Sequence, residues 1–205
     1  MLVAVLGASG HVSKYIVPEL LKMGFAVRVL SRSGFHSNSH CEVFTGDALN
    51  ASDINNFLVG ADAVINCIGQ LKNASGFYTR VTENIISAMT GYRLRRYLLI
   101  TNSAVVLSTD VRTLLTEIGA AAFKLLFPKM MVDKNEEVKV LMNSDLDWTI
   151  FRLPWVMDGQ SSKGAKFSDS RMGGFRIFSR QVAEAVVQEL SNRQHIRRAP
   201  LIYNA

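Results

Sequence analysis

The chain has 205 residues, and its 23 lysines and arginines against 17 aspartates and glutamates give a net charge of +6. Apolar residues make up 48% of the sequence, which is enough for a sizeable core and excludes intrinsic disorder. No apolar run approaches the roughly 20 residues of a membrane span. The first residues also lack the basic region of a signal peptide. We therefore expect one cytoplasmic domain over residues 1–205, with no membrane partner.

The cysteines and the two groups of arginines limit which ligands and partners the sequence predicts. Cys41 and Cys67 are too few for a disulfide scaffold and show no metal-ligand spacing to the histidines, so no metal is expected. The arginine groups lie at 93–96 and 193–198, each where a predicted helix gives way to a predicted strand. Cations at helix carboxyl ends complement the helix dipole, and we favour this interpretation over a nucleic-acid surface. With no aromatic platform or recognition helix in the sequence, we expect no nucleic-acid partner.

Strand and helix patterns alternate along the whole chain. Short apolar runs typical of buried parallel strands occupy residues 2–6, 25–30, 42–45, 63–68, 97–101, 148–153 and 201–203, the last at a sheet edge. Helical patterns occupy 12–23, 52–58, 76–90, 110–126, 133–143 and 179–190, with Asp133 and Ser179 as predicted amino-terminal caps. This alternation predicts a three-layer α/β fold: a doubly wound parallel sheet with helices on both faces, the Rossmann architecture.

A glycine pair directly after the first predicted strand carries the clearest functional signal. Gly7 permits a tight turn, and Gly10 lets the backbone approach a pyrophosphate at the positive end of the following helix. The pair lies in a strand–turn–helix–strand unit of about 30 residues, the context that this motif requires. Position 13, where a third glycine is usual, holds Ser13. The residues predicted to bind a dinucleotide here are Gly7, Ala8, Ser9, Gly10, His11 and Val12, with a solvent-facing His11 ring as the favoured alternative.

The second predicted strand ends in Ser31, Arg32 and Ser33, with no carboxylate nearby. NAD-preferring proteins usually place an acidic residue at this point for the ribose 2′-hydroxyl. A guanidinium and two hydroxyls suit a 2′-phosphate instead, through charge and bidentate hydrogen bonds. The sequence therefore predicts NADP(H) in preference to NAD(H). A surface arginine without a ligand is the alternative.

Motifs spread over nearly the whole chain resemble those of a known family. They read GASGHV at 7–12, SRS at 31–33, GDALN at 46–50, NCIG at 66–69, TNSA at 101–104, NSDLDWTIFRLP at 143–154 and APLIYN at 199–204. In these motifs the chain resembles the atypical short-chain dehydrogenase/reductase superfamily, in particular its NmrA-like NAD(P)H-binding branch, which includes flavin and biliverdin-type reductases. The segment DLDWTIFRLP is a far more specific match than the glycine turn.

The resemblance implies where the rest of the cofactor would lie. The implied contacts are, in chain order, Asp47 and Ala48 at the adenine, Cys67, Ile68 and Gly69 along the adenosine ribose, Thr101, Asn102 and Ser103 at the nicotinamide, and Pro154, Trp155 and Val156 closing over it. All follow predicted strands, and ligands of such sheets bind outside the carboxyl ends of the strands. For the Cys67 side chain, a small buried hydrophobic group is the favoured alternative.

Lys134 is the candidate active-site lysine by the same resemblance, because its spacing to Arg152 matches the family's. Independently, Lys134, Val138 and Leu141 share one helical stripe that faces the core. The ammonium group must then reach solvent or meet a ligand such as the nicotinamide ribose.

The proton-donating tyrosine of family dehydrogenases has no counterpart, since Met130 takes its place. Without that acid, reduction of a simple carbonyl is disfavoured. A flavin or quinone is less demanding, because it delocalises charge and can take a proton from water. Ser103 would hydrogen-bond the acceptor, or else cap a helix. We therefore expect an NADPH-dependent oxidoreductase that transfers hydride to a flavin, quinone or similar conjugated acceptor, with catalytic Ser103 and Lys134, as a monomer or homodimer.

The main alternative is a redox-sensing regulator that binds NADP(H) without turnover, as some NmrA-like proteins do. The missing tyrosine favours this alternative. Against it, the sequence has no obvious exposed apolar helix that would dock a partner.

Residues 155–178 lack a clear periodicity and are expected to form a short substrate-side region. Trp155 and Phe167 are expected to stack on a planar ring there. A mobile lid is predicted from four glycines: Gly159, Gly164, Gly173 and Gly174.

Overall fold

The computed structural model of the chain describes residues 1–34, 41–69, 75–111, 113–159, 161 and 163–204. In chain order its strands are β1 (Leu2–Leu6), β2 (Ala26–Ser31), β3 (Glu42–Thr45), β4 (Ala63–Asn66), β5 (Arg96–Asn102), β6 (Asp147–Leu153), β7 (Trp155–Met157), β8 (Ala165–Ser168), β9 (Arg176–Phe178) and β10 (Leu201–Asn204). Its helices are α1 (Ser13–Lys22), α2 (Ala51–Leu58), α3 (Phe77–Gly91), α4 (Leu114–Leu126), α5 (Pro128–Met142) and α6 (Ser179–Asn192). Within the described residues, no helix combines the length and apolarity needed to cross a membrane.

The main sheet has the strand order β3-β2-β1-β4-β5-β6-β10-β8. Neighbours from β3 to β10 are parallel, whereas β8 runs antiparallel to β10. The chain winds outward from β1 to β3, then returns to the other side of β1 with β4, which creates a topological switch point between β1 and β4. The predicted doubly wound α/β fold is confirmed. The predicted edge position of β10 is wrong, because β8 lies beside it with Ser168 opposite Leu201.

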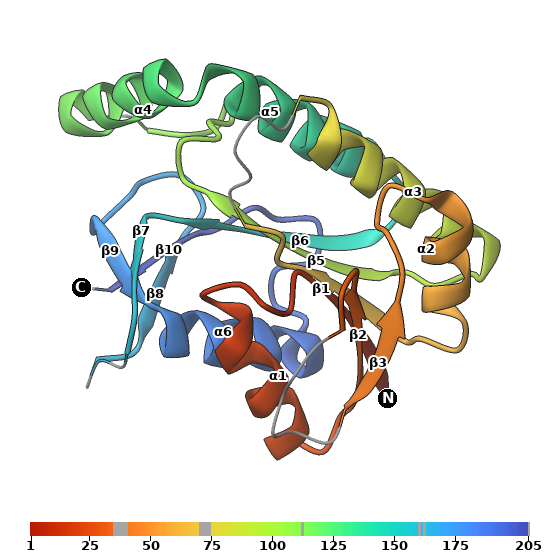
Figure 1. Cartoon of the computed structure of the whole chain (residues 1–205). Coiled ribbons are helices and arrows are strands. Elements are labelled where there is room, and N and C mark those ends of the chain that lie inside the picture. The colour runs from red at the N-terminus through yellow and green to blue at the C-terminus, as the bar shows by residue number, and fades with distance from the viewer. Residues whose placement is uncertain (35–40, 70–74, 112, 160, 162, 205) are drawn as a thin grey trace.

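Helices cover both faces of this sheet, with α2, α3 and α5 on one side and α1 and α6 on the other (Figure 1). Successive side chains of a strand point to opposite faces. β1 therefore supplies Ala4 and Leu6 to the core under α3 and α5, and Val3 and Val5 to the core over α1 and α6. All four are fully buried, which explains why a central strand has a continuous apolar run.

The predicted cap at Asp133 is wrong, because α5 begins earlier, with Pro128 in its first turn. Proline suits that position, where its missing N–H would have no helical partner. Asp133 therefore lies inside α5, where it is buried, and its carboxylate accepts hydrogen bonds from the backbone N–H groups of Tyr78 and Thr79 at 3.0 and 3.1 Å. The aspartate does cap a helix, but that helix is α3, far away in the sequence.

Ser179 is likewise not the cap of α6. The helix begins at Ser179 itself, with Phe178 as the residue before it. The Ser179 hydroxyl donates instead to the carbonyl oxygen of Met157 at 3.1 Å, which ties the start of α6 to the end of β7.

Helix α4 is an exposed apolar helix, contrary to the expectation that the chain has no obvious one. Leu114, Ile118 and Leu125 are 73%, 58% and 83% exposed. Periodicity indicates which residues share a face of a helix. It does not indicate whether another element covers that face, and here none of the described residues buries these three side chains.

Residues 155–178 contain more regular structure than expected. β8 extends the main sheet, and β7 and β9 form a separate two-stranded parallel sheet. A side chain at Gly173 would collide with the Tyr203 ring, and a Cβ atom at Gly174 would lie 2.5 Å from the Asn204 carbonyl oxygen. These two glycines allow close packing on β10, which accounts for glycine at both positions. The mobile lid stays a prediction.

Phe167 does not point into the predicted substrate region. Its ring stacks on the His195 ring, with centroids 5.0 Å apart and planes 23° from parallel. Because β8 is antiparallel to β10, Phe167 lies alongside Ile202 and faces the segment that leads into β10. The expectation that Phe167 stacks on a bound ring is therefore wrong.

We expect Gly173→Ala to lower the free energy of unfolding by about 1–3 kcal/mol, because the added methyl overpacks the contact with Tyr203. Gly164 provides the matched control, since a Cβ atom there would meet nothing within 4 Å. Gly164→Ala should change stability by less than about 0.5 kcal/mol. Urea unfolding of both variants measures the difference, and equal stabilities would contradict the packing role of Gly173.

Candidate functional site

The carboxyl ends of six neighbouring parallel strands form the candidate site. The loops after β1, β2, β3, β4, β5 and β6 begin at one edge of the sheet, because these strands lie side by side and point the same way. Every residue group that the sequence assigns to the cofactor lies in the last residues of one of these strands or just after it. The topology therefore gathers segments spread over most of the chain along one edge.

Gly7 lies at the switch point, directly against the end of β4. Its φ is +77°, a backbone conformation that favours glycine. A Cβ atom there would lie 2.7 Å from the Ile68 nitrogen and 2.8 Å from the Cys67 carbonyl oxygen. The N–H of Gly10 donates to the Gly7 carbonyl at 3.0 Å and closes the turn. Glycine is thus required at position 7 by both conformation and space.

Ser13 stands in place of the usual third glycine, and its side chain is accommodated between α1 and the strand ends. Its side chain is fully buried, and its hydroxyl donates to the Gly7 carbonyl at 2.6 Å. The same oxygen lies 3.0 Å from the sulfur of Cys67, whose thiol donates to the Leu6 carbonyl at 2.9 Å. Burial raises the pKa of the Cys67 thiol to about 12, so this thiol stays protonated at neutral pH. The two side chains fasten α1 to the ends of β1 and β4.

The amino-terminal end of α1 lacks the side-chain caps that α2 and α4 have. No side chain caps it, and no acidic residue lies in its first turn. Asn50 caps α2 and Thr113 caps α4 through side-chain oxygens. Among the described residues, nothing accepts a hydrogen bond from the backbone N–H groups of Ala8, Ser9 or His11. N–H groups without an acceptor, next to the positive end of the helix dipole, suit an anionic group such as a pyrophosphate.

The end of β2 places one arginine beside this turn, in the next loop along the sheet. Ser31 turns the chain through a hydrogen bond from its hydroxyl to the Gly34 carbonyl at 2.6 Å. Arg32 and Ser33 are exposed, and Arg32 makes no ion pair with any residue that the structure describes. The guanidinium is therefore available to a ligand at this edge.

After β3, the predicted adenine-side residues form a tight polar turn. The Asp47 carboxylate accepts from the Leu49 N–H at 3.0 Å, and the Asp47 N–H donates to the Asp53 carboxylate at 2.8 Å. Ala48 is buried, and its carbonyl accepts from the Asn84 side chain of α3. Position 48 thus offers a small side chain in a rigid turn.

The ends of β5 and β6 are joined at the predicted nicotinamide side. The Ser103 N–H donates to the Leu153 carbonyl at 2.7 Å. The hydroxyl oxygen of Thr101 is buried and has no hydrogen-bond partner among the described residues. A buried hydroxyl without a partner is costly, so this atom marks a place for a polar group of a ligand.

An ion pair that sequence reasoning missed holds the loop after β5 in place. Arg152 is fully buried, and its two terminal nitrogens lie 2.5 and 2.8 Å from the two carboxylate oxygens of Asp110. Arg152 also donates to the carbonyls of Val105 and Ala199. The sequence signals the arginine but not its partner, because the predicted helix over 110–126 included Asp110, whereas α4 begins at Leu114 and leaves Asp110 in the preceding loop.

Lys134 finds its partners inside the protein. Its side chain is 4% exposed, its Nζ lies 3.0 Å from a Glu137 carboxylate oxygen, and it lies 3.7 Å from the centre of the Tyr78 ring. The ammonium group therefore meets a carboxylate and an aromatic ring of the protein, and its contact with the nicotinamide ribose stays a prediction. The Tyr78 hydroxyl donates to the Gly69 carbonyl, which links this group to the loop after β4. Burial raises the pKa of the Glu137 carboxyl, and the neighbouring Lys134 opposes that shift.

Beyond β6, Pro154 and Val156 are half-buried, whereas Trp155 is 75% exposed. The Trp155 N–H donates to the carbonyl of Phe175, whose side chain is also exposed. Two exposed aromatic residues therefore lie together just past the carboxyl end of β6. Exposed aromatic side chains at this edge suit a ligand better than a core.

The family model for NAD(P)H-binding proteins matches residues 7–193. The chain belongs to this NAD(P)H-binding family. By sequence, no curated protein matches it. The match takes in the glycine turn, α1 and β4, the strand that borders the switch point, with Ser13 in place of the usual third glycine.

Solved structures share the fold of this NAD(P)H-binding chain. A short-chain dehydrogenase/reductase from Veillonella parvula DSM 2008, solved in complex with NADP, is 17% identical with a TM-score of 0.82, over 99% of this chain and 94% of that one. A candidate NADH-flavin reductase from Streptococcus pneumoniae TIGR4 is 22% identical with a TM-score of 0.82, over the whole of both chains. These likenesses show that the chain shares its fold with a short-chain dehydrogenase/reductase.

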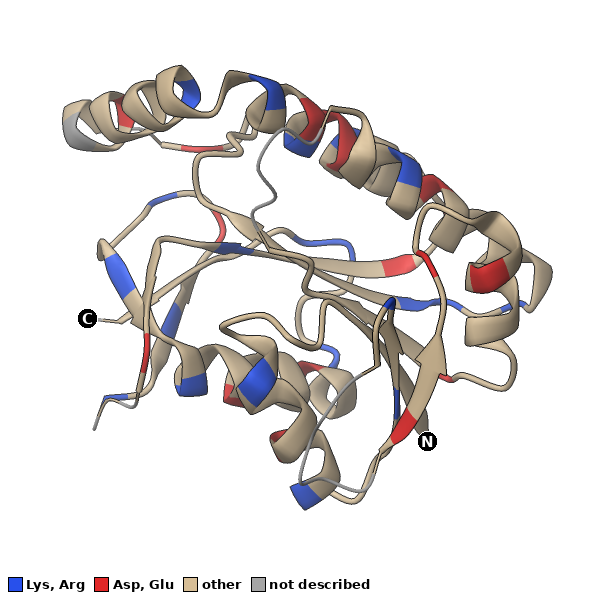
Figure 2. Cartoon of the chain, in the orientation of Figure 1, with Lys and Arg blue, Asp and Glu red and all other residues tan. Residues whose placement is uncertain are grey.

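The two arginine groups lie away from the dinucleotide-binding edge, where β5 and β6 begin (Figure 2). Arg96 is buried and pairs with Glu189 at 2.9 Å. Further guanidinium groups pair with exposed or half-buried carboxylates: Arg95 and Arg193 with Asp147, Arg197 with Asp145, and Arg198 with Asp169. The positive charges of these arginines are therefore balanced by nearby carboxylates more than by the ends of helix dipoles.

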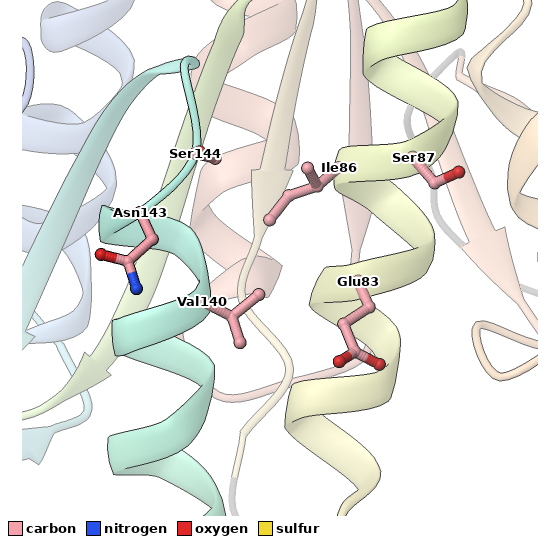
Figure 3. Close-up of a pocket in the computed structure, with 6 residues that line it drawn as sticks. All are labelled: Glu83, Ile86, Ser87, Val140, Asn143 and Ser144. Carbon is pink, nitrogen blue, oxygen red and sulfur yellow. The ribbon is translucent and has the colours of Figure 1, made fainter.

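A surface hollow of about 440 Å³ between α3 and α5 also lies outside the site (Figure 3). It is lined by Glu83, Ile86, Ser87, Val140, Asn143 and Ser144, the last two just past the end of α5. Among the described residues, no cluster of three or more histidine, cysteine or acidic side chains could hold a metal ion. His36 and His40 lie outside the described residues.

We expect Asp110→Ala to lower the free energy of unfolding by about 3–5 kcal/mol, because it leaves the buried Arg152 charge unpaired. Glu136→Ala is the matched control, since it breaks an exposed pair with Lys139 that contributes less than about 1 kcal/mol. Guanidinium chloride unfolding of the two variants gives the comparison. Similar small losses in both would show that the buried pair does not hold the loop.

Proposed function

We propose that the chain is an NADPH-dependent reductase that transfers hydride to a flavin, a quinone or a similar conjugated acceptor. The observation that carries this proposal is the uncapped amino-terminal end of α1 beside Gly7, at the switch point of a family NAD(P)H-binding fold. The bound nicotinamide cofactor would supply the hydride. The chain would supply binding, orientation and exclusion of water.

Preference for NADPH rests on Arg32. Its exposed guanidinium follows β2, the strand next to β1, where a Rossmann fold meets the adenosine ribose. A planar guanidinium can donate two hydrogen bonds to a 2′-phosphate and also neutralise its charge. The Ser31 hydroxyl already donates to the Gly34 carbonyl, so Ser33 is the residue whose hydroxyl would donate a further hydrogen bond to the 2′-phosphate.

A conjugated acceptor is supported by the groups at the ends of β5 and β6. Trp155 and Phe175 present exposed aromatic surface that would stack on a planar ring. Thr101 and Ser103 would offer hydroxyls to polar atoms of the nicotinamide or the acceptor. Met130, at the position of the usual tyrosine, is buried, and its thioether has no acidic proton to donate to a substrate. An acceptor that stabilises negative charge by delocalisation, and takes its proton from water, fits such a site better than a simple carbonyl.

Lys134 would act on the nicotinamide ribose as a positioning group. Its charge is balanced by Glu137 and its ammonium group lies over the Tyr78 ring, so it would keep one location. The Tyr78 contact with Gly69 places this group at the loop after β4.

A second candidate is a redox-sensing regulator that binds NADP(H) without turnover. It is supported by the internal pairing of Lys134 with Glu137, which leaves no evident acid at the site, and by the exposed apolar surface of α4. The two candidates share the cofactor and differ in whether hydride leaves it.

Arg32→Ala should weaken NADPH binding by about 10- to 100-fold, the loss of roughly 1.5–3 kcal/mol from charge-assisted hydrogen bonds. NADH binding should stay unchanged, because NADH lacks the 2′-phosphate. Fluorescence titration with both nucleotides measures this, with Lys22→Ala at the other end of α1 as the control. An equal loss for both nucleotides would contradict the proposed 2′-phosphate contact.

The purified chain should oxidise NADPH when FMN, FAD or a small quinone is added, as seen from the loss of NADPH absorbance. Binding without turnover on any of these acceptors would favour the regulator. Failure to bind either nucleotide would overturn both candidates. Ser13, in place of the usual third glycine, would then be the first residue to examine as the cause, with Ser13→Gly as the variant to test.

A further inference from the structure

Helix α4 presents an apolar surface that the proposed reductase does not use. It lies at one end of the helical layer and continues directly toward α5 (Figure 1). Over residues 114–126 the sequence contains two charged residues, Glu117 and Lys124, and the rest of the helix is apolar or small apart from Thr116 (Figure 2). Apolar side chains exposed together in this way mark interaction sites in soluble proteins.

The exposed residues form one defined seam. Leu114, Ile118, Ala121 and Leu125 are spaced by four, three and four residues, the spacing of the apolar seam of a coiled coil. All four are exposed. At about 100° per residue, Phe123 lies on the opposite side, and it packs against the core. The seam therefore faces away from the body of the protein.

The charges beside the seam are complementary to those of a second copy. Glu117 and Lys124 are seven residues apart, so they lie on the same side of the seam. When two copies of such a helix pair in antiparallel orientation, residues at this flanking position meet across the contact. Glu117 then meets Lys124 of the second copy, and the two-fold symmetry repeats the pair. Parallel pairing provides no such match.

An anionic membrane surface fits α4 less well. Helices that lie in a membrane interface carry several lysines or arginines on the polar face. α4 has one lysine, and an acidic residue lies on the same flank. The charge pattern thus favours a partner of matching pattern over a uniformly negative surface.

We propose that α4 is a self-association surface, through which two copies of the chain pair in an antiparallel, two-fold symmetric contact. Leu114 packs against Leu125 of the second copy, and Ile118 packs against Ala121 of the second copy. The small side chain of Ala121 lets the two helices approach closely. One pair of helices is smaller than the standard interface of about 1,600 Å², so the dimer is weak, with a dissociation constant on the order of micromolar.

Sedimentation velocity over a concentration series tests the dimer directly. We expect the wild-type chain to shift from monomer to dimer in the micromolar range, and Leu125→Lys to weaken dimerisation by at least about 100-fold. Val59→Lys is the matched control, since Val59 is also an exposed apolar residue but lies beyond α2, and it should dimerise as the wild type does. Circular dichroism and NADPH titration confirm that each variant is folded.

Charge reversal tests the orientation. Glu117→Lys and Lys124→Glu should each weaken the dimer by about 10-fold, and the double variant should recover, because each reversed pair meets its complement. A wild-type chain that stays monomeric at several hundred micromolar would overturn the proposal, as would a dimer that Leu125→Lys leaves intact. Failure of the double variant to recover overturns the antiparallel contact. Binding of a monomer to vesicles of phosphatidylglycerol, lost in Leu125→Lys, would assign the surface to a membrane instead.

Discussion

The contact between Gly7 and the end of β4 is the constraint on which the rest of the site depends. β1 and β4 are neighbours in the sheet, and their loops leave in opposite directions, so the backbone at Gly7 passes within contact of Cys67 and Ile68. Any side chain at position 7 would push these loops apart. Ser13 and Cys67 then hold the start of α1 against both strands, which fixes the turn that carries the N–H groups of Ala8, Ser9 and His11.

Buried charged groups fix the loops that surround this edge. Asp133 of α5 holds the first turn of α3, and Asp110 holds the loop after β5 against Arg152 of β6, so both act between elements distant in the chain. Lys134 and Glu137 form a second ion pair within α5, and the Lys134 ammonium lies over the Tyr78 ring of α3. Such pairs stabilise a fold little in total, since desolvation opposes them, but losing one partner leaves a charge stranded. They therefore specify where the loops lie more than how stable the domain is.

Local patterns predicted the elements and the edge at which the site lies, because strand–turn–helix units depend on neighbouring residues and parallel strands share one carboxyl edge. Long-range pairing could not be predicted in this way. The sequence around Asp133 fits a capping box, yet the carboxylate caps another helix, because Pro128 starts α5 earlier. The stripe containing Lys134 was visible, but its contact with Tyr78 depends on how α3 packs on α5. Similarly, periodicity located the apolar residues of α4 without indicating that they stay uncovered.

The two outer strands of the sheet have a consequence for how copies of the chain can meet. β3 and β8 are only four residues long, and each carries an exposed charged side chain, Glu42 on one and Lys166 on the other. β8 also occupies the open side of the apolar strand β10 along its full length. Short, charged edges resist the addition of further strands, which is the usual route from a sheet to fibrous aggregates. Crowded copies of this chain are thus kept from joining sheet to sheet, and their contacts are left to the helical surfaces.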